Sequence, residues 1–127
     1  MLSLRDIGWI AGFLEAEGSF YFNFTRGATI EVCHSQTKDL AKETKTADIL
    51  VVAVGKAKLI NAKHVNKNQV VIDVGINIAN GKMVGDIDFP KVSKIVRAIS
   101  PVPGGIGPMT VASLFENLLD AYRLQTK

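Results

Sequence analysis

Apolar residues in the later part of the chain form short uninterrupted runs that alternate with stretches of helical spacing. Residues 49–54 and 70–74 are apolar runs bounded by polar residues and glycine, which is typical of strands buried on both faces of a parallel sheet. A last strand is predicted over residues 99–102, and helices are predicted over residues 38–46 and 109–123. This alternation predicts an α/β fold: a three-layer, Rossmann-like domain with a mostly parallel sheet.

Two shorter signals lie between these elements. Asn80-Gly81 is typical of a tight hairpin turn and is followed by a short edge strand predicted over residues 82–86. Pro90 suits the first turn of a helix predicted over residues 90–98, because proline has no N–H to leave unpaired there.

The first part of the chain follows a different pattern. Ile7, Ile10 and Leu14 recur on one helical face, and Gly18 would end that helix. Residues 19–25 then alternate aromatic and polar side chains, which predicts a strand. A hairpin through Arg26-Gly27 would join it to a second strand over residues 28–33, so the sheet would gain an antiparallel strand.

Composition and charge narrow the class of protein. At 127 residues, with 47% hydrophobic and 21% charged residues, we expect one globular domain covering residues 1–127. No apolar run approaches the roughly 20 residues of a membrane span, and no signal-peptide pattern opens the chain, so a cytoplasmic protein without a membrane partner is expected. The net charge of +3 is spread along the sequence, which makes a nucleic-acid partner an unfavoured interpretation.

Several reactive side chains have ordinary interpretations. The lone Cys33 is expected to be a buried thiol. His64, in a short helix predicted over residues 61–65, is expected to be exposed. Asp86 and Asp88 lie two residues apart without a third ligand, so no metal site is predicted there.

Glycine and proline dominate residues 101–108, immediately before the predicted last helix. Backbone that approaches a helix N-terminus without large side chains can bind an anionic or carbonyl-bearing group, because the unpaired N–H groups and the helix dipole both face it. The alternative is a sharp turn that only begins an ordinary helix.

The string PVPGGIGPMT at residues 101–110 resembles the C-terminal signature of the bifunctional methylenetetrahydrofolate dehydrogenase/cyclohydrolase family. Residues from about 26 to 123 are similar to the second half of that family's NADP-binding domain, through VCHS at 32–35, ADILVVAVGK at 47–56, VVIDVGIN at 70–77 and VGDIDF at 84–89. One departure is Gly55-Lys56-Ala57-Lys58, where the family usually has Gly-Lys-Pro-Gly.

The resemblance implies NADP as cofactor and assigns roles to particular residues. Ser35 would lie near the 2′-phosphate of NADP, although from the residues alone it could equally cap the helix over 38–46. Ile76 would lie near the nicotinamide. The substrate would contact the glycine-rich loop, at Pro103, Gly104, Gly105, Ile106 and Gly107.

The resemblance also implies parts that are not found in these residues. The family's Gly-Arg-Ser phosphate loop and its separate N-terminal domain, which supplies a lysine and a tyrosine, are missing from the sequence. Hydride transfer requires both reactants to be held in place, so we expect no catalytic residue. NADP binding is expected to be lost or weak, with a dissociation constant on the order of millimolar, roughly 4 kcal/mol.

Residues 3–25 are similar to the LAGLIDADG helix and first strand of homing endonucleases. That resemblance would make Glu17 a ligand for a catalytic metal and would allow two helices to pack through Gly8, Gly12 and Ala16 as a homodimer. Because such a site needs two carboxylates and a basic sheet, we expect no metal site.

The chain is therefore predicted to be a chimera of residues 1–27 and a partial Rossmann-type domain over residues 28–127. The join could have a designed, selected or natural origin. The first hypothesis is a folded domain without catalysis of its own. The alternative is a weak NADP- or folate-binding module, and a DNA endonuclease is the least favoured.

Overall fold

The computed structural model describes residues 30–126. Three strands form a parallel sheet in the order β1 (Ile49–Val52), β2 (Val70–Asp73) and β5 (Ala98–Ile99). Ile49 pairs with Val70, and Val70 pairs with Ala98. The predicted Rossmann-like α/β fold with a mostly parallel sheet is confirmed. The predicted helix before residue 18 and the strand over 19–25 lie outside the described residues, as do Gly8, Gly12, Ala16 and Glu17.

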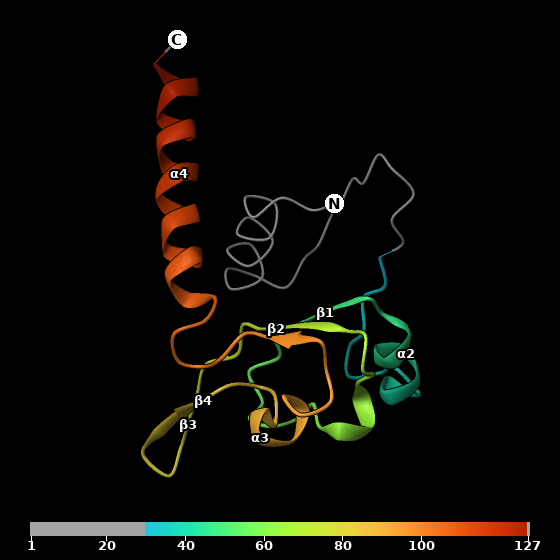
Figure 1. The fold of residues 1–127 in the computed structure, drawn as a ribbon. Helices are drawn as coiled ribbons and strands as arrows, with labels where there is room; N and C mark the ends of the chain where they lie inside the picture. Colours follow the sequence, from blue (N-terminus) through green and yellow to red (C-terminus); the bar gives the residue numbers. More distant parts are fainter. Residues whose placement is uncertain (1–29, 127) are drawn as a thin grey trace.

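One face of the sheet carries the larger part of the core. Helix α2 (Leu40–Thr46), the 3₁₀ helix η1 (Ala62–His64) and helix α3 (Phe89–Val92) lie on this side (Figure 1). Val71 of β2 is 1% exposed and Val92 of α3 is 0% exposed. They belong to one buried cluster whose other members are Val52, Ile60, Val65 and Ile87.

The opposite face is covered by the beginning of helix α4 (Gly107–Gln125). Ile106 and Met109 pack there against Val51, Ile72 and Val74. The rest of α4 extends away from the sheet (Figure 1).

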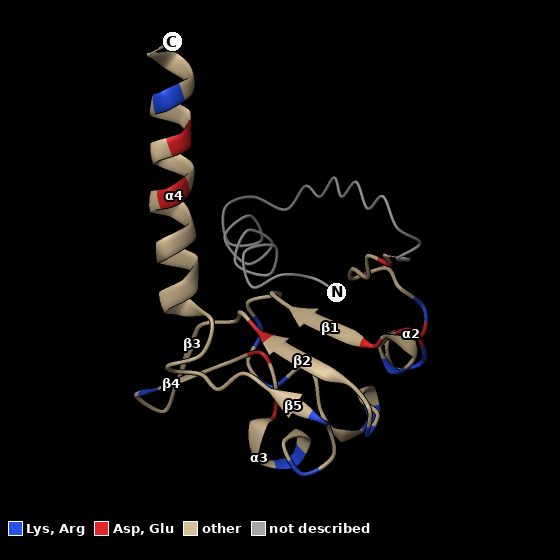
Figure 2. Ribbon diagram, turned by 45° about the horizontal axis from the view of Figure 1, so that its top comes forward, with Lys and Arg blue, Asp and Glu red and all other residues tan. Residues whose placement is uncertain are grey.

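A three-layer fold would place the closing helix against the sheet, but among residues 30–126 only the beginning of α4 covers it. Its apolar side chains are exposed: Leu114 is 65% and Phe115 66% accessible. Glu116, Asp120 and Arg123 carry the few charges of the helix, which is otherwise uncharged over most of its length (Figure 2). The helix therefore presents an apolar stripe with no partner among residues 30–126.

The hairpin was predicted correctly from its turn. Strands β3 (Asn77–Ala79) and β4 (Lys82–Val84) pair antiparallel. Asn80 and Gly81 both have positive φ, at 52° and 72°, as a two-residue hairpin turn of type I′ requires. The second strand ends at Val84 rather than at residue 86, because the N–H of Asp86 donates to the Asp73 carboxylate instead of to a ladder.

Two other boundaries differ because long-range pairing overrides local pattern. Helix α3 stops at Val92, not at residue 98, since the chain must reach Ala98 in register with Val70 and Arg97 donates its N–H to the carbonyl of Gln69. Strand β5 ends at Ile99, before Pro101, which cannot donate a ladder hydrogen bond.

The strand predicted over residues 28–33 is wrong for its described part. Residues 30–33 form no strand, and the side chains of Ile30 and Val32 are 43% and 58% exposed. Cys33 is half-buried rather than buried. Strand β1 is also less covered than predicted, since Ile49 is 41% exposed; within residues 30–126 it is an outer strand of the sheet.

Side-chain amides attach α2 to the sheet. The Gln69 side chain, 0% exposed, donates from Nε2 to the carbonyls of Thr44 and Ala47, and Asn66 donates to the carbonyl of Lys45. The last carbonyls of a helix have no intrahelical partners. These amides therefore satisfy the C-terminal end of α2 while fixing it beside β2.

His64 is buried, with 6% of its surface exposed, so the prediction of an exposed side chain is wrong. Its Nδ1 accepts the N–H of Asn61, whose own side chain accepts from Lys63 and so caps η1. Burial of the imidazole and the nearby Lys63 lower the pKa of His64 below its usual 6.5.

We expect the stability of the fold to fall as the pH is lowered through about 6.5. The unfolded chain takes up the His64 proton first, so acid favours the unfolded state. Urea unfolding between pH 7.5 and pH 5 measures this. His64→Gln should flatten the dependence, whereas His34→Gln, which removes an exposed imidazole, should not. An unchanged pH dependence in His64→Gln would contradict the expectation.

Lys58 has a φ of 57°, a left-handed conformation in which glycine is favoured. Its N–H donates to the carbonyl of Gly85, which holds the turn in place. We expect Lys58→Gly to raise the free energy of unfolding by about 1 kcal/mol, because the left-handed conformation costs a side-chain-bearing residue about that much. Lys56→Gly is the matched control, in the same loop without positive φ, and should not stabilise. Equal effects of the two substitutions in urea unfolding would contradict this account.

Candidate functional site

The carboxyl ends of the three parallel strands meet at one edge of the sheet, and a pocket lies there. Its walls come from the segment after β2, from the loop between β5 and α4, and from Met83 of the hairpin. The cavity has a volume of about 70 Å³, enough for part of a ligand rather than for a whole nucleotide. This is where open α/β sheets bind their ligands.

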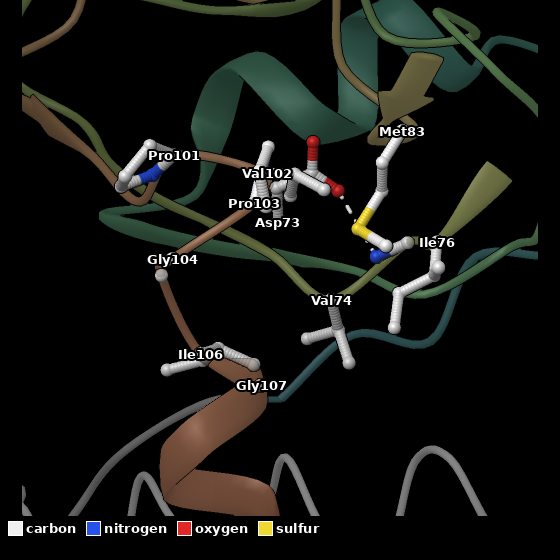
Figure 3. A pocket seen from close by; sticks show the side chains of 12 residues that line it. Asp73, Val74, Ile76, Met83, Pro101, Val102, Pro103, Gly104, Ile106 and Gly107 are labelled. Carbon is white, nitrogen blue, oxygen red and sulfur yellow. Dashed lines mark hydrogen bonds between the residues drawn. The ribbon is translucent and has the colours of Figure 1, made fainter. Parts of the chain in front are cut away.

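Apolar side chains form most of the pocket wall. Val74 and Ile106 lie on the side where α4 begins, and Ile76 and Met83 lie on the other side (Figure 3). Pro101, Val102 and Pro103 add further apolar side chains, and glycines and Asp73 form the rest of the lining. Such a wall suits the flat face of a ring better than a charged group.

Asp73 is the one charged residue among those that line the pocket. It is 2% exposed, and its oxygens accept the backbone N–H groups of Gly75, Asp86 and Ile87. Burial raises the pKa of this carboxyl, although the three hydrogen bonds oppose the rise. Its oxygens are occupied, so Asp73 shapes the pocket rather than presenting a free base to it.

The loop before α4 follows from its glycines and prolines. The Val102-Pro103 peptide bond is cis, and Gly104 has a φ of 92°. Gly105 is packed so closely that a Cβ there would overlap the carbonyl oxygen of Pro101. Pro108 lies in the first turn of α4, where its missing N–H leaves no donor unpaired.

Among residues 30–126, the N–H groups of Ile106 and Gly107 have no backbone hydrogen-bond acceptor. The first bonds of α4 run from the N–H groups of Met109 and Thr110 to the carbonyl of Ile106. Earlier N–H groups have no intrahelical acceptor. The pocket therefore combines an apolar wall with free N–H groups at a helix N-terminus, which suits a ring bearing carbonyl or amide oxygens.

The structure brings together most of the residues predicted from the sequence. Ile76, 55% exposed, and the loop over residues 103–107 line the same pocket although nearly thirty positions separate them. Ser35 is not among the lining residues; it lies in an exposed turn. The alternative that Ser35 caps the following helix is wrong, because Asp39 caps α2 by accepting the N–H of Lys42.

Six residues of the pocket lining were not predicted as site residues: Asp73, Val74, Gly75, Met83, Pro101 and Val102. Asp73 and Val74 belong to the motif VVIDVGIN, so the strand end that precedes Ile76 was a usable signal. No sequence signal pointed to Met83, because only the position of the hairpin in space brings this residue to the pocket.

No metal centre forms at Asp86 and Asp88. Asp86 accepts three N–H donors, and Asp88 pairs with Lys91 at 2.8 Å. Within residues 30–126, no three His, Cys, Asp or Glu side chains are grouped so that they could hold a metal ion. No helix in this part of the chain is long and apolar enough to cross a membrane.

Residues 19–126 match the family model described as tetrahydrofolate dehydrogenase/cyclohydrolase, NAD(P)-binding domain. The bifunctional protein FolD of Methanosphaerula palustris is 57% identical over 99 residues, which are 78% of this chain and 35% of that protein. FolD of Hydrogenobaculum is 50% identical over 113 residues, 89% of this chain and 41% of its own length. The chain thus spans about a third of the length of these relatives.

Solved structures of methylenetetrahydrofolate dehydrogenase/cyclohydrolases are similar to this chain as well. The bifunctional 5,10-methylenetetrahydrofolate dehydrogenase/cyclohydrolase of Thermoplasma acidophilum has a TM-score of 0.75 and 48% identity, over 80% of this chain and 37% of that one. The Trypanosoma brucei enzyme, complexed with NADP cofactor and inhibitor, has a TM-score of 0.68 and 35% identity, over 79% of this chain and 37% of its own.

The proposed LAGLIDADG part finds no support in these comparisons. The family match begins at residue 19, so it includes residues 19–25, which the endonuclease resemblance also covers. Glu17 lies outside the match and outside the described residues.

We expect Gly105→Ala to disrupt the pocket loop and to lower the free energy of unfolding by about 1–3 kcal/mol, because the added methyl group meets the backbone of Pro101. Gly107→Ala is the matched control, since a Cβ at Gly107 meets no atom within 4 Å. Urea unfolding of both variants measures the difference. Equal tolerance of the two would show that the close approach at Gly105 is not required.

Proposed function

Because this chain belongs to the tetrahydrofolate dehydrogenase/cyclohydrolase family, through its NAD(P)-binding domain, we propose that it binds NADP along the carboxyl edge of its parallel sheet. The observation that carries the proposal is the pocket in which Ile76 and residues 103–107 meet. Open parallel sheets bind dinucleotides at this edge.

The residues of the pocket fit one end of such a cofactor. The apolar wall would contact the nicotinamide ring at Ile76, and the N–H groups at the beginning of α4 would donate to carboxamide or substrate oxygens. NADP, when bound, accepts or supplies a hydride. The chain's own contribution is to hold the ring in place and to exclude water from one of its faces.

Ser35 is proposed as the contact for the 2′-phosphate of NADP. Its exposed turn follows residues 30–33, and a hydroxyl can donate to a phosphate oxygen. The Trypanosoma brucei enzyme was solved with NADP, which supports this choice of cofactor over NAD. The small cavity favours weak binding.

The substrate is proposed to be a folate, contacting Pro103, Gly104, Gly105, Ile106 and Gly107. Hydride transfer requires donor and acceptor to be held together, and among residues 30–126 the pocket offers no free acid or base, since the Asp73 oxygens are occupied. We therefore propose a nucleotide-binding role without catalysis by these residues alone. A cytoplasmic setting and a homodimer through Gly8, Gly12 and Ala16 remain proposals.

A ¹⁵N–¹H correlation titration of the whole chain with NADP tests the function. We expect the amide peaks of Ser35, Ile76 and residues 104–107 to shift at millimolar nucleotide. Ser35→Ala should weaken NADP binding about tenfold or more, the effect of one hydrogen bond to a charged group, and leave NAD binding unchanged. Ser113→Ala, on α4 away from the pocket, is the control. Absence of shifts at Ile76 and at 104–107 would contradict the proposal.

A further inference from the structure

Two buried carboxylates at the pocket edge, Asp73 and Asp86, accept hydrogen bonds from neighbouring segments of the chain. Asp73, at the end of β2, accepts the N–H groups of Asp86 and Ile87 at 3.0 and 3.1 Å and that of Gly75 at 3.0 Å. Asp73 thereby attaches the segment after the hairpin to the end of β2.

Asp86 in turn connects its own segment to two other parts of the chain. It is 0% exposed, and its Oδ2 accepts the N–H groups of Val54 and Gly55, at 2.6 and 2.8 Å, where the chain leaves β1. Its Oδ1 accepts the side-chain amide of Asn77 at 2.8 Å, at the beginning of β3. One carboxylate therefore joins the ends of two segments that are far apart in sequence.

Glycine is required beside each carboxylate. A Cβ added at Gly75 would overlap the carboxyl group of Asp86, and a Cβ added at Gly85 would overlap that of Asp73. Each aspartate thus lies against the backbone of the segment that carries the other. Asp86 is therefore packed against Gly75, and Asp73 against Gly85.

No cation among residues 30–126 compensates these charges. Within residues 30–126 the ion pairs are Lys91 with Asp88 and Arg123 with Asp120, and neither includes Asp73 or Asp86. Backbone and amide N–H donors surround both carboxylates instead. Charge-assisted hydrogen bonds of this kind are stronger than neutral ones and hold the geometry closely.

Resting on the proposed function, we propose that Asp86 is a positioning residue for the nucleotide. Asp86 does not line the pocket, but it contacts Gly75, which does, and Ile76 follows directly. The Asp86 carboxylate is packed against Gly75, which precedes Ile76, and it accepts a hydrogen bond from Asn77, which follows Ile76. Through these two contacts Asp86 determines where Ile76 lies. It also holds the chain at Val54 and Gly55, the exit of the neighbouring strand.

The test compares Asp86→Ala with Asp86→Asn in the full chain, with NADP as the probe. Alanine leaves three donors without an acceptor, so NADP affinity should fall about tenfold and the amide peaks of Gly75 and Ile76 should move before nucleotide is added. Asparagine keeps an acceptor for Val54 and Gly55, and its NH₂ can donate to a reversed Asn77 amide. Affinity should then return to within about threefold of the wild type.

Asp88→Ala is the matched control, because this neighbouring carboxylate makes only the ion pair with the exposed Lys91. It should leave NADP affinity and the Ile76 peak unchanged. Asn77→Ala removes a single link and keeps the inference testable if Asp86→Ala does not fold; it should move the Ile76 peak and weaken NADP binding by a smaller factor.

Folded but destabilised variants that bind NADP as tightly as the wild type would overturn the positioning role. If the wild-type chain itself shows no NADP-dependent shifts, the proposed function fails. The nucleotide-free spectra then decide separately: displaced Gly75 and Ile76 peaks in Asp86→Ala, restored in Asp86→Asn, support the positioning of the pocket wall, and unchanged peaks overturn it.

Discussion

The geometry of the sheet edge depends on two buried carboxylates, Asp73 and Asp86, that pair with no cation among residues 30–126. Burial of an ionised carboxylate is costly unless its hydrogen-bonding capacity is filled, and the chain fills it with N–H donors from the exit of β1, the exit of β2 and the end of the hairpin. The same bonds satisfy backbone donors that have left the ladders. Loops that would otherwise be independent therefore form one unit, and the pocket wall is part of it.

This constraint also explains the shape of the hairpin and its connection. The N–H of Asp86 donates to the Asp73 carboxylate rather than to a neighbouring strand, so β4 ends at Val84. The parallel bridge between Ile60 and Ile87 then brings the segment beneath the sheet into the larger core. Asp73 lines the pocket and also accepts the N–H of Ile87, whose side chain lies in the hydrophobic core. The raised pKa of Asp73 reflects its burial between the pocket and this core.

Features set by local chemistry could be predicted from the sequence. The apolar runs at β1 and β2, the Asn80-Gly81 turn and Pro108 in the first turn of α4 each depend on residues within a few positions. Features set at long range could not. The bond between Asp86 and Val54 spans 32 positions, and the burial of His64 depends on the elements packed around it rather than on its neighbours in sequence. The family resemblance supplied Ile76 and residues 103–107, which the structure brings together, whereas Met83 enters the pocket only through the placement of the hairpin.

The two ends of helix α4 differ in how far they are packed against the rest of the described chain. Its first turn is attached to the sheet through Ile106 and Met109, and Thr110 is 7% exposed, whereas Leu124 near its other end is 75% exposed. Beyond its first turn, α4 has no packing partner among residues 30–126, and a helix without tertiary contacts is only marginally stable in water. The free energy of local opening should therefore decline along α4, from nearly that of global unfolding at its beginning to almost zero near Gln125. We expect fraying to start at the end remote from the pocket, so that its motion leaves the loop before the helix in place.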